Sequence, residues 1–400
     1  MTDYVRYYDE DAVGLNDGTS EENAWTSEGT MASALNTLMN TTAVNGDSII
    51  VYCKRSETAR TSTALWTSID STITDTASSK IVPLVFEGYK SIPGDGGDDG
   101  INNYFQRTKE VQFSRCTVRY FDIRIGQTSS GRCFMGNNDA LFESCYAVAE
   151  ATGTSNTAHG YQLTYSGCHN CYGEISSGTT STGDSHAFIG STHSHASNCF
   201  FRGPVKIQTR FSSGPLTNVV ITRSDSSSNN TTFASRGLLT IDGDVDPRGW
   251  SLNNVTIYNS PGAGIWFEDS YQNNGALTSA LVMQGLVIYN CAGAAFDNNP
   301  GAWTSTIPLN TYNSFYGLCT GGKLGTGVSD PFSRISLLSS DPFVDAANDD
   351  FRINENSTGG AEIASASTFG WTRWGLPFTF DLLSGAIQRA AGSSIISHAY

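Results

Sequence analysis

The chain has 400 residues, of which only 15% are charged, and its formal net charge is −15 at pH 7. An acidic chain without a Lys/Arg cluster does not suit nucleic-acid phosphates, and no stretch approaches the roughly 18 apolar residues that span a bilayer. We therefore expect neither nucleic acid nor a membrane as a partner.

The composition predicts an all-β protein. The 41 Gly residues lie with many Ser, Thr and Asn residues between short apolar runs, which is typical of short strands joined by turns. The N-terminal stretch MTDYVRYYDEDAVGLNDG has no basic region followed by an apolar one, so we expect no secretory signal.

The nine cysteines predict reduced thiols. Their number is odd, and the CHNC motif (168–171) has no second pair to complete a zinc site. This pattern favours a protein made in a cytosol, with no bound metal.

In chain order, the first predicted elements are a helix and two strands. The spacing of Met31, Leu35 and Leu38 predicts a helix with one apolar face. Two apolar runs rich in β-branched and aromatic residues follow it and predict strands. These runs are SIIVYC (48–53) and IVPLVFE (81–87).

From about residue 116 the chain repeats a strand, a turn and a second strand, as in NVTIYNS followed by GIWFED. The first inward residue of each repeat recurs at intervals of roughly 20 to 36 residues, which predicts a solenoid with loops of variable length on one side. The residue two positions later points the same way, into one core. The predicted inward positions are Cys116, Cys145, Cys168, Cys199, Val219, Val255, Leu286 and Leu309.

Two features of the repeat predict its interior and its corners. Four successive inward positions are Cys, which we interpret as small, buried and chemically inert side chains. Asn259, Asn290 and Asn313 follow the strands, and Asn tolerates the left-handed backbone of a sharp turn. Each Asn side chain can hydrogen-bond either its own turn or the equivalent Asn one coil away.

The second strand of each repeat is expected to form a second wall of the solenoid. These strands are RCFMG, HGYQLT, SHAFIG, RGLLTI, GIWFED and GAAFDN.

The whole pattern resembles the right-handed parallel β-helix of the pectate-lyase-like superfamily. The segment YYDEDAVGLNDGTSEENAW (7–25) is similar to the N-terminal segment of that family. The segments SSDPFVDAANDDFRINENS (339–357) and SGAIQRA (384–390) are similar to its C-terminal segment. The resemblance covers most of residues 5–390, and it implies architecture more than chemistry, because these coils carry lyases, hydrolases, epimerases and non-enzymatic virion proteins.

The resemblance implies one structural domain, a single-stranded right-handed parallel β-helix of about ten coils. We expect an N-terminal segment with a capping helix over residues 1–45, the coils over 46–335, and a C-terminal capping segment over 336–400.

The first candidate site is acidic. The motif IDGDVDP places Asp242, Asp244 and Asp246 on one face of an extended segment, with Glu268 and Asp269 one coil later. Hydrolysis of a glycosidic bond needs two such carboxyl groups. A solvated turn is one alternative and Ca²⁺ binding is another, although a proline stands where an EF-hand loop needs glycine.

The second candidate site combines bases and acids. Arg202, Lys206 and Arg210 in RGPVKIQTR follow Asp184 and His186 in GDSHAFIG. A polysaccharide lyase would use such a base beside a group that neutralises the substrate carboxylate. The motifs Asn-Thr-Asp, Gly-His-Gly and Arg-Ile-Lys of polygalacturonases do not occur.

An aromatic face is the third candidate site. Tyr258, Tyr289 and Tyr312 are predicted to stack on successive coils, with Trp266 and Asp269 nearby. Sugars dock on such faces through their C–H side, while polar neighbours take the hydroxyl groups. The alternative is an aromatic ladder that only stiffens the solenoid or lies under a loop.

A second outward row is apolar. It contains Tyr146, Phe200, Val220 and Val287, which are unusual on a face open to water. Either a loop of the same chain or another subunit is expected to cover this row.

Two classes of function remain. The first is a bacteriophage virion protein, made in the host cytoplasm: a tail spike, a tail fibre or a capsid decoration. It would contact other virion proteins, form a homo-oligomer such as a trimer, and bind surface polysaccharide without a cofactor. The alternative is an extracellular polysaccharide lyase or glycoside hydrolase. The absence of a complete catalytic motif and the apolar outward row favour the virion protein.

Overall fold

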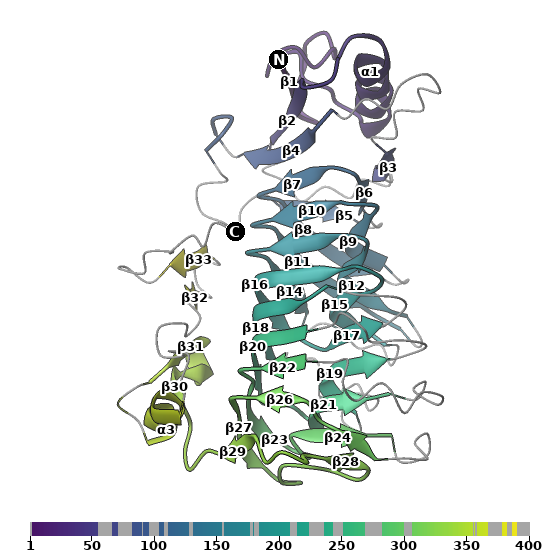
Figure 1. Cartoon of the computed structure of the whole chain (residues 1–400). Helices are drawn as coiled ribbons and strands as arrows, with labels where there is room; N and C mark the ends of the chain where they lie inside the picture. The colour runs from purple at the N-terminus through teal and green to yellow at the C-terminus, as the bar shows by residue number, and fades with distance from the viewer. Residues whose placement is uncertain are drawn as a thin grey trace.

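In the computed structural model the chain winds into a right-handed parallel β-helix, with the N-terminus at one end and the coils stacked in chain order below it (Figure 1). The structure describes residues 2–54, 66–70, 82–89, 91–95, 104–107, 111–127, 131–153, 156–176, 179, 184–208, 214–223, 236–242, 251–268, 282–299, 306–354, 356, 358–366, 378–381 and 386–389.

The larger sheet, sheet A, has 18 strands in the described residues, all paired in parallel between neighbouring coils. They are β1 (Asp3–Tyr8), β2 (Ser48–Lys54), β4 (Leu84–Tyr89), β5 (Tyr104–Arg107), β7 (Thr117–Arg119), β8 (Asp122–Gln127), β10 (Leu141–Glu143), β11 (Tyr146–Ala151), β13 (Gly167–His169), β14 (Tyr172–Ile175), β16 (His195–Arg202), β18 (Leu216–Thr222), β20 (Ser251–Tyr258), β22 (Val282–Gln284), β23 (Val287–Cys291), β26 (Thr311–Tyr312), β27 (Ser314–Cys319) and β29 (Ile335–Leu337).

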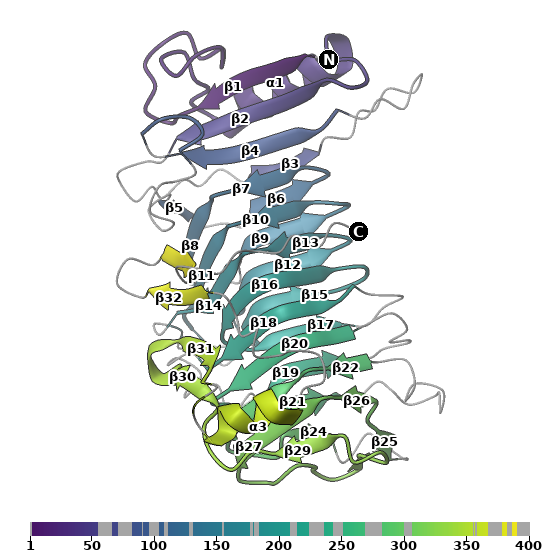
Figure 2. The same cartoon turned by 60° about the vertical axis from the view of Figure 1, so that its left-hand side comes forward.

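The second sheet, sheet B, contains the second strand of each repeat, as the sequence predicts. Its nine described strands are β3 (Trp66–Asp70), β6 (Val111–Ser114), β9 (Gly131–Asn137), β12 (Ala158–Thr164), β15 (His186–Gly190), β17 (Val205–Gln208), β19 (Gly237–Asp242), β21 (Ala263–Phe267) and β24 (Phe296–Asn298). Sheet B runs from β3 to β24, and the sheet A strands β1, β2 and β4 lie beyond its N-terminal end (Figure 2).

Helix α1 (Glu28–Thr41) lies at the N-terminal end of the solenoid (Figure 1). Ser27 caps it by accepting a hydrogen bond from the backbone N–H of Thr30. The predicted apolar face is confirmed, because Met31, Leu35 and Leu38 are buried in the same core cluster as the first strands. No helix in the described part of the chain is long and apolar enough to cross a membrane.

The remaining described elements lie in the last coil and the C-terminal segment. They are β25 (Ile307–Pro308), β28 (Val328–Ser329), β30 (Phe343–Asp345), the 3₁₀ turn η3 (Ala346–Asn348), β31 (Asp350–Ile353), α3 (Thr358–Ala366), β32 (Phe378–Asp381) and β33 (Ala386–Arg389).

The four predicted inward cysteines share one interior, as expected. Cys116, Cys145, Cys168 and Cys199 are all buried in a single core cluster that runs through the solenoid. All nine cysteines of the chain are free thiols. Burial raises the pKa of the Cys116 thiol, and of the Cys145 thiol, so both are protonated and unreactive in the folded state.

The predicted register of these cysteines was partly wrong. Cys168 pairs with Phe142 and Ala196, not with the other cysteines. Cys171, rather than Cys168, is aligned with Cys145 and Cys199. The residue directly after each of these three cysteines pairs with its equivalent in the neighbouring coil. The error arose because each coil of sheet A turns a corner, so two inward positions three residues apart lie on different arms of the sheet.

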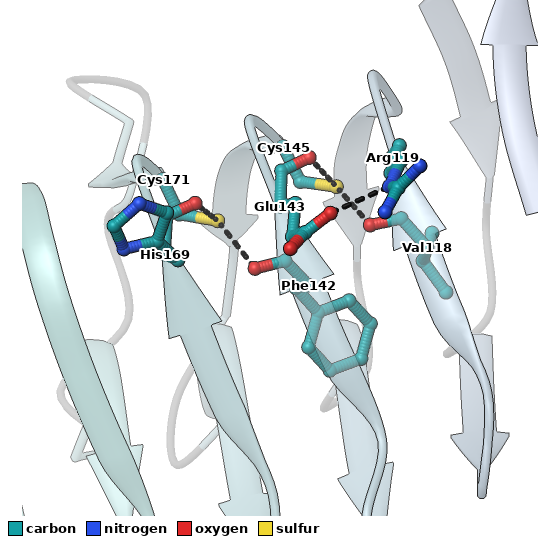
Figure 3. A network of polar contacts seen from close by, with 7 residues as sticks. All are labelled: Val118, Arg119, Phe142, Glu143, Cys145, His169 and Cys171. Atoms are coloured by element: carbon teal, nitrogen blue, oxygen red, sulfur yellow. Dashed lines mark hydrogen bonds and ion pairs between the residues drawn. The ribbon is translucent and has the colours of Figure 1, made fainter. Parts of the chain in front are cut away.

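The thiols fill gaps beside backbone carbonyl groups. Figure 3 shows Cys145 Sγ donating to the carbonyl oxygen of Val118, and Cys171 Sγ donating to that of Phe142, each at 3.4 Å. On the outside of the same strands, Arg119 Nε donates to Glu143 Oε2 at 2.5 Å. Phe142 points inward and its neighbour Glu143 outward, as the pleat requires, whereas Cys145 and Cys171 lie at the corners after β10 and β13.

The corner of sheet A is held by an asparagine ladder. Asn218 Nδ2 donates to Asn198 Oδ1 at 3.0 Å, and Asn254 Nδ2 donates to Asn218 Oδ1 at 3.0 Å. All three have a positive φ of 53° to 56°, which Asn tolerates better than most residues.

A second ladder lies at the next corner, where Asn290 Nδ2 donates to Asn259 Oδ1 at 3.4 Å. The left-handed backbone predicted for Asn259, Asn290 and Asn313 is confirmed. Asn313, however, follows Tyr312, which pairs with Gln284, so it belongs to the first corner.

The C-terminal segment turns back along the outside of the solenoid. In both views β30, β31 and α3 lie beside the lower coils of sheet A (Figures 1 and 2). Phe343, Phe351 and Ile363 of this segment form a second buried cluster with the outward side chains Phe200 and Val220. A loop of the same chain thus covers the apolar outward row, which was one of the two predicted alternatives.

Candidate functional site

The outward face of sheet B carries the charged cluster that the two sequence motifs share. Lys206, Thr240 and Trp266 pair along three successive strands, β17, β19 and β21. Asp242 lies two residues beyond Thr240, and Glu268 two residues beyond Trp266, so all five side chains point away from the core. The two predicted candidate sites are therefore one site.

Lys206 joins the two acidic side chains. Its Nζ lies 2.9 Å from Asp242 Oδ2 and 3.0 Å from Glu268 Oε2. The lysine side chain is only 13% exposed, and that of Glu268 only 14%. Because both carboxylates contact one nitrogen, their oxygens lie within about 6 Å of each other.

The charge of Lys206 is fixed by this arrangement. Burial lowers the pKa of Lys206, but hydrogen bonds and charges from Asp242 and Glu268 outweigh burial and raise the pKa above its ordinary value. Lys206 is therefore protonated at neutral pH and is not a ready base for proton abstraction.

Arg236 extends the ion-pair network, and the sequence analysis missed it. Its Nη1 lies 2.5 Å from Glu268 Oε1 and 3.8 Å from Asp184 Oδ2. Arg236 directly precedes β19, so the RGLLTI motif contained the signal, but one arginine before a strand has no specific pattern. The cluster has the charges of two cations and three carboxylates.

Two histidines lie beside the cluster on the same face. His186 of β15 pairs with His159 of β12, and their rings are 5.5 Å apart between centroids. Both side chains are buried. Burial, with a smaller contribution from the Arg132 charge, lowers the pKa of His159 to about 3.

His186 is neutral for similar reasons. Burial lowers its pKa well below the ordinary value, and the nearby charges of Lys206 and Arg236 act in the same direction. This predicted catalytic candidate is thus a buried, uncharged imidazole at the edge of the cluster. His159 was not predicted, because its motif HGYQLT reads as an ordinary strand.

Trp266 of β21 lies at the end of the site opposite the two histidines. Its neighbours Ile265 and Phe267 belong to the core, whereas Trp266 points outward and is still only 9% exposed. Its buried Nε1 has no hydrogen-bond partner in the described part of the chain, and the same holds for Nδ1 of His159. A buried polar group without a partner is unusual and marks a place where a ligand can donate or accept.

Several predicted residues are placed elsewhere. Asp244, Asp246, Asp269 and Arg210 lie outside the described residues. Arg202, predicted to lie near Lys206, is on β16 of sheet A and forms an ion pair with Asp349 of the C-terminal segment.

The predicted open face of three tyrosines was wrong in two respects. Tyr258 and Tyr289 do pair and stack, with centroids 6.5 Å apart, but Phe343 and Phe351 pack edge-on against Tyr258. The C-terminal segment thus covers this row and leaves Tyr289 only 7% exposed.

Tyr312 lies in a different row. It pairs with Gln284, and Gly317 takes the position next to Tyr289. Tyr312 is 42% exposed, with the guanidinium of Arg334 over its ring at 4.3 Å. The predicted register assigned Tyr312 to the strand that stacks on β23, whereas Tyr312 ends the two-residue strand β26, which stacks on β22. So short a strand has no pattern that would reveal its register.

Metal binding finds little support in this region. Within the described ranges no group of three or more His, Cys, Asp or Glu side chains is arranged to hold a metal ion. Of the three carboxylates in the predicted Ca²⁺ loop, Asp242 contacts Lys206 Nζ at 2.9 Å, and Asp244 and Asp246 lie outside the described residues.

The strand pairing defines a parallel β-helix protein with a buried polar site on one outward face, which confirms the predicted fold. Among solved structures, the chain is similar to one described as "Crystal structure of pectate lyase Pel9A", with 12% identity, a TM-score of 0.48, and coverage of 89% of this chain and 90% of that chain. No protein-family model and no curated protein matches the sequence.

Proposed function

We propose that this protein is a glycan-binding β-helix of the virion-surface type, and that sheet B carries its binding site. The observation that supports this best is the unpartnered indole N–H of Trp266, buried beside the Lys206 ion-pair cluster. Sugar-binding sites combine an aromatic ring with a few fixed polar groups in this way.

The charges of the site favour binding over cleavage. A glycosidase needs one carboxyl group that holds a proton, and a lyase needs a neutral base. Asp242 and Glu268 both form ion pairs with Lys206, and Lys206 is itself protonated. The reduced, buried thiols suit a chain that folds in a cytosol, as virion proteins do.

A glycan array probed with the full chain tests the proposal. Trp266→Ala should lower the affinity for any bound glycan at least tenfold, because it removes both the ring and its N–H group. Tyr258→Ala is the matched control, since it removes a ring from sheet A. Loss of binding in the Tyr258 variant alone would place the site on sheet A and overturn the proposal.

The virion setting needs its own experiments. Mass spectrometry of purified phage particles should find the protein among the structural components. Light scattering after size-exclusion chromatography should give a homo-oligomer, with a trimer as the expected form. A monomer that is absent from particles would contradict this part of the proposal.

Glycoside hydrolysis is the second candidate, and one distance favours it. The oxygens of Asp242 and Glu268 lie within about 6 Å, close to the separation of about 5 to 5.5 Å between the two carboxyl groups of a retaining glycosidase. Reducing-end assays on bound glycans test this candidate. Release that disappears in Glu268→Gln would support hydrolysis, and its absence on every bound glycan would exclude it.

A further inference from the structure

The charges on the outward face of sheet B indicate which class of glycan fits the site. Lys206 and Arg236 are the cations of the ion-pair cluster, and Asp184, Asp242 and Glu268 are its carboxylates, so carboxylates outnumber cations there. Lys206 and Arg236 already contact carboxylates at 2.5 to 3.0 Å. Both cations are thus already paired, and an added negative charge would compete with these carboxylates for them.

A uronate would therefore bind at a disadvantage. Its carboxylate would have to displace Glu268 or Asp242 from a salt bridge whose members are largely buried, and the displaced group would lose its partner. The net charge of −15 of the whole chain adds a general repulsion of polyanions.

Neutral hydroxyl groups meet no such barrier. The indole N–H of Trp266 can donate to a sugar oxygen, and Nδ1 of His159 can donate or accept according to its tautomer. Neither atom has a partner in the described residues, so each can gain a hydrogen bond without breaking one.

The site is also long enough for several sugar units. His159 lies on β12 and Trp266 on β21, which are four strands apart in sheet B. At the usual strand spacing, this separation is about 19 Å along the solenoid axis. The ion-pair cluster lies between these two ends.

We propose that the sheet B site binds neutral oligosaccharides, such as hexose or N-acetylhexosamine polymers, and discriminates against uronate polymers. This inference rests on the function proposed above and names its ligand class. The carboxylates already paired with Lys206 and Arg236 disfavour an anionic ligand, and the unpartnered groups of Trp266 and His159 contribute the hydrogen bonds.

Calorimetry with the full chain tests the inference on neutral oligosaccharides and on oligogalacturonate and alginate oligomers. Neutral ligands should bind at least tenfold more tightly, with an affinity that is nearly unchanged between low and high salt. Tighter binding of uronates would overturn the inference and leave glycan binding intact. Binding of neither class would overturn the proposed function itself.

Two variants test the mechanism of selection. Asp184→Asn removes a half-exposed carboxylate beside Arg236 and should improve the relative affinity for uronates several-fold. Glu143→Gln, the matched control, removes a carboxylate from the sheet A ion pair with Arg119 and should leave the preference unchanged. Equal effects of the two variants would show that only net charge matters and would contradict selection by the charges of this site.

Trp266→Phe tests the hydrogen bond separately from the ring. It retains the aromatic face and removes only the N–H group, so neutral glycans should bind about five- to tenfold more weakly. Unchanged affinity, in a variant with unchanged thermal stability, would exclude the indole N–H from recognition.

Discussion

Lys206 and Glu268 lie two coils apart in the solenoid, and Lys206 Nζ meets Glu268 Oε2 at 3.0 Å on the outward face of sheet B. Between them in chain order lie 61 residues, so only the stacking of the coils brings them together. This contact, with that of Asp242, fixes the charge pattern on which the proposed ligand class depends.

Removal of the lysine should destabilise the fold. Lys206→Met leaves Asp242 and Glu268 without their shared cation, and we expect the free energy of unfolding to fall by about 3 kcal/mol. The double variant with Asp242→Asn should regain part of this loss, because Glu268 keeps its ion pair with Arg236. Chemical denaturation measures both. A double variant no more stable than the single one would show that the lysine acts through packing alone.

The C-terminal segment should depend on Phe351. This ring is 2% exposed and packs against Phe200, Tyr258 and Phe343 at centroid distances of 5.3 to 5.9 Å. Phe351→Ala should cost about 3 to 5 kcal/mol, and hydrophobic-dye binding should rise as the aromatic row is exposed. Phe332→Ala, at a 60% exposed ring, is the control and should change stability little. Similar losses in both variants would contradict the covering role.

Stability should fall in acid through His159. Its folded pKa of about 3 lies below the ordinary 6.5, so between these values the unfolded chain binds more protons than the folded one. Its contribution is therefore complete above about pH 6.5 and is lost as the pH falls, by about 3 kcal/mol at pH 4. His159→Gln should reduce the fall in stability over this window, and the buried His186, whose pKa is also lowered, contributes to the remainder. An unchanged pH profile in this variant, with the fold intact, would refute the assignment.

Thiol reactivity should separate one cysteine from the other eight. Cys319 is partly exposed and all the others are buried. In native protein a thiol reagent should modify one group at most, and in denaturant it should modify all nine. Cys319→Ser should abolish the native reaction. Rapid modification of several thiols without unfolding would contradict a single packed interior.

The asparagine ladder should tolerate glycine better than alanine. Asn218 has φ of 54° and hydrogen-bonds Asn198 and Asn254. Asn218→Gly loses only the hydrogen bonds of the ladder, and the free energy of unfolding should fall by about 1 to 2 kcal/mol. Asn218→Ala adds the strain of a left-handed Cβ, about 1 to 2 kcal/mol more. Equal unfolding free energies for the two variants would show that the backbone is not constrained there.

The sequence determined the solenoid and its inward positions. The alternation of side chains in each strand sorts inward from outward residues without reference to neighbours, so buried Cys, Val and Ile residues and the strands of both sheets were predictable. The left-handed asparagines were predictable for a similar local reason, because Asn tolerates that backbone in any context.

Only the tertiary structure decided register and coverage. When coils differ in length, the sequence does not show which residue of one coil lies beside which residue of the next. For this reason the prediction aligned Cys168 instead of Cys171 with the other cysteines, and placed Tyr312 in the wrong row. The sequence likewise could not show that the C-terminal segment covers Tyr258, or that Lys206 lies between Asp242 and Glu268. These contacts join residues far apart in the chain, and their positions are set by the sum of all intervening loops, which no local pattern encodes.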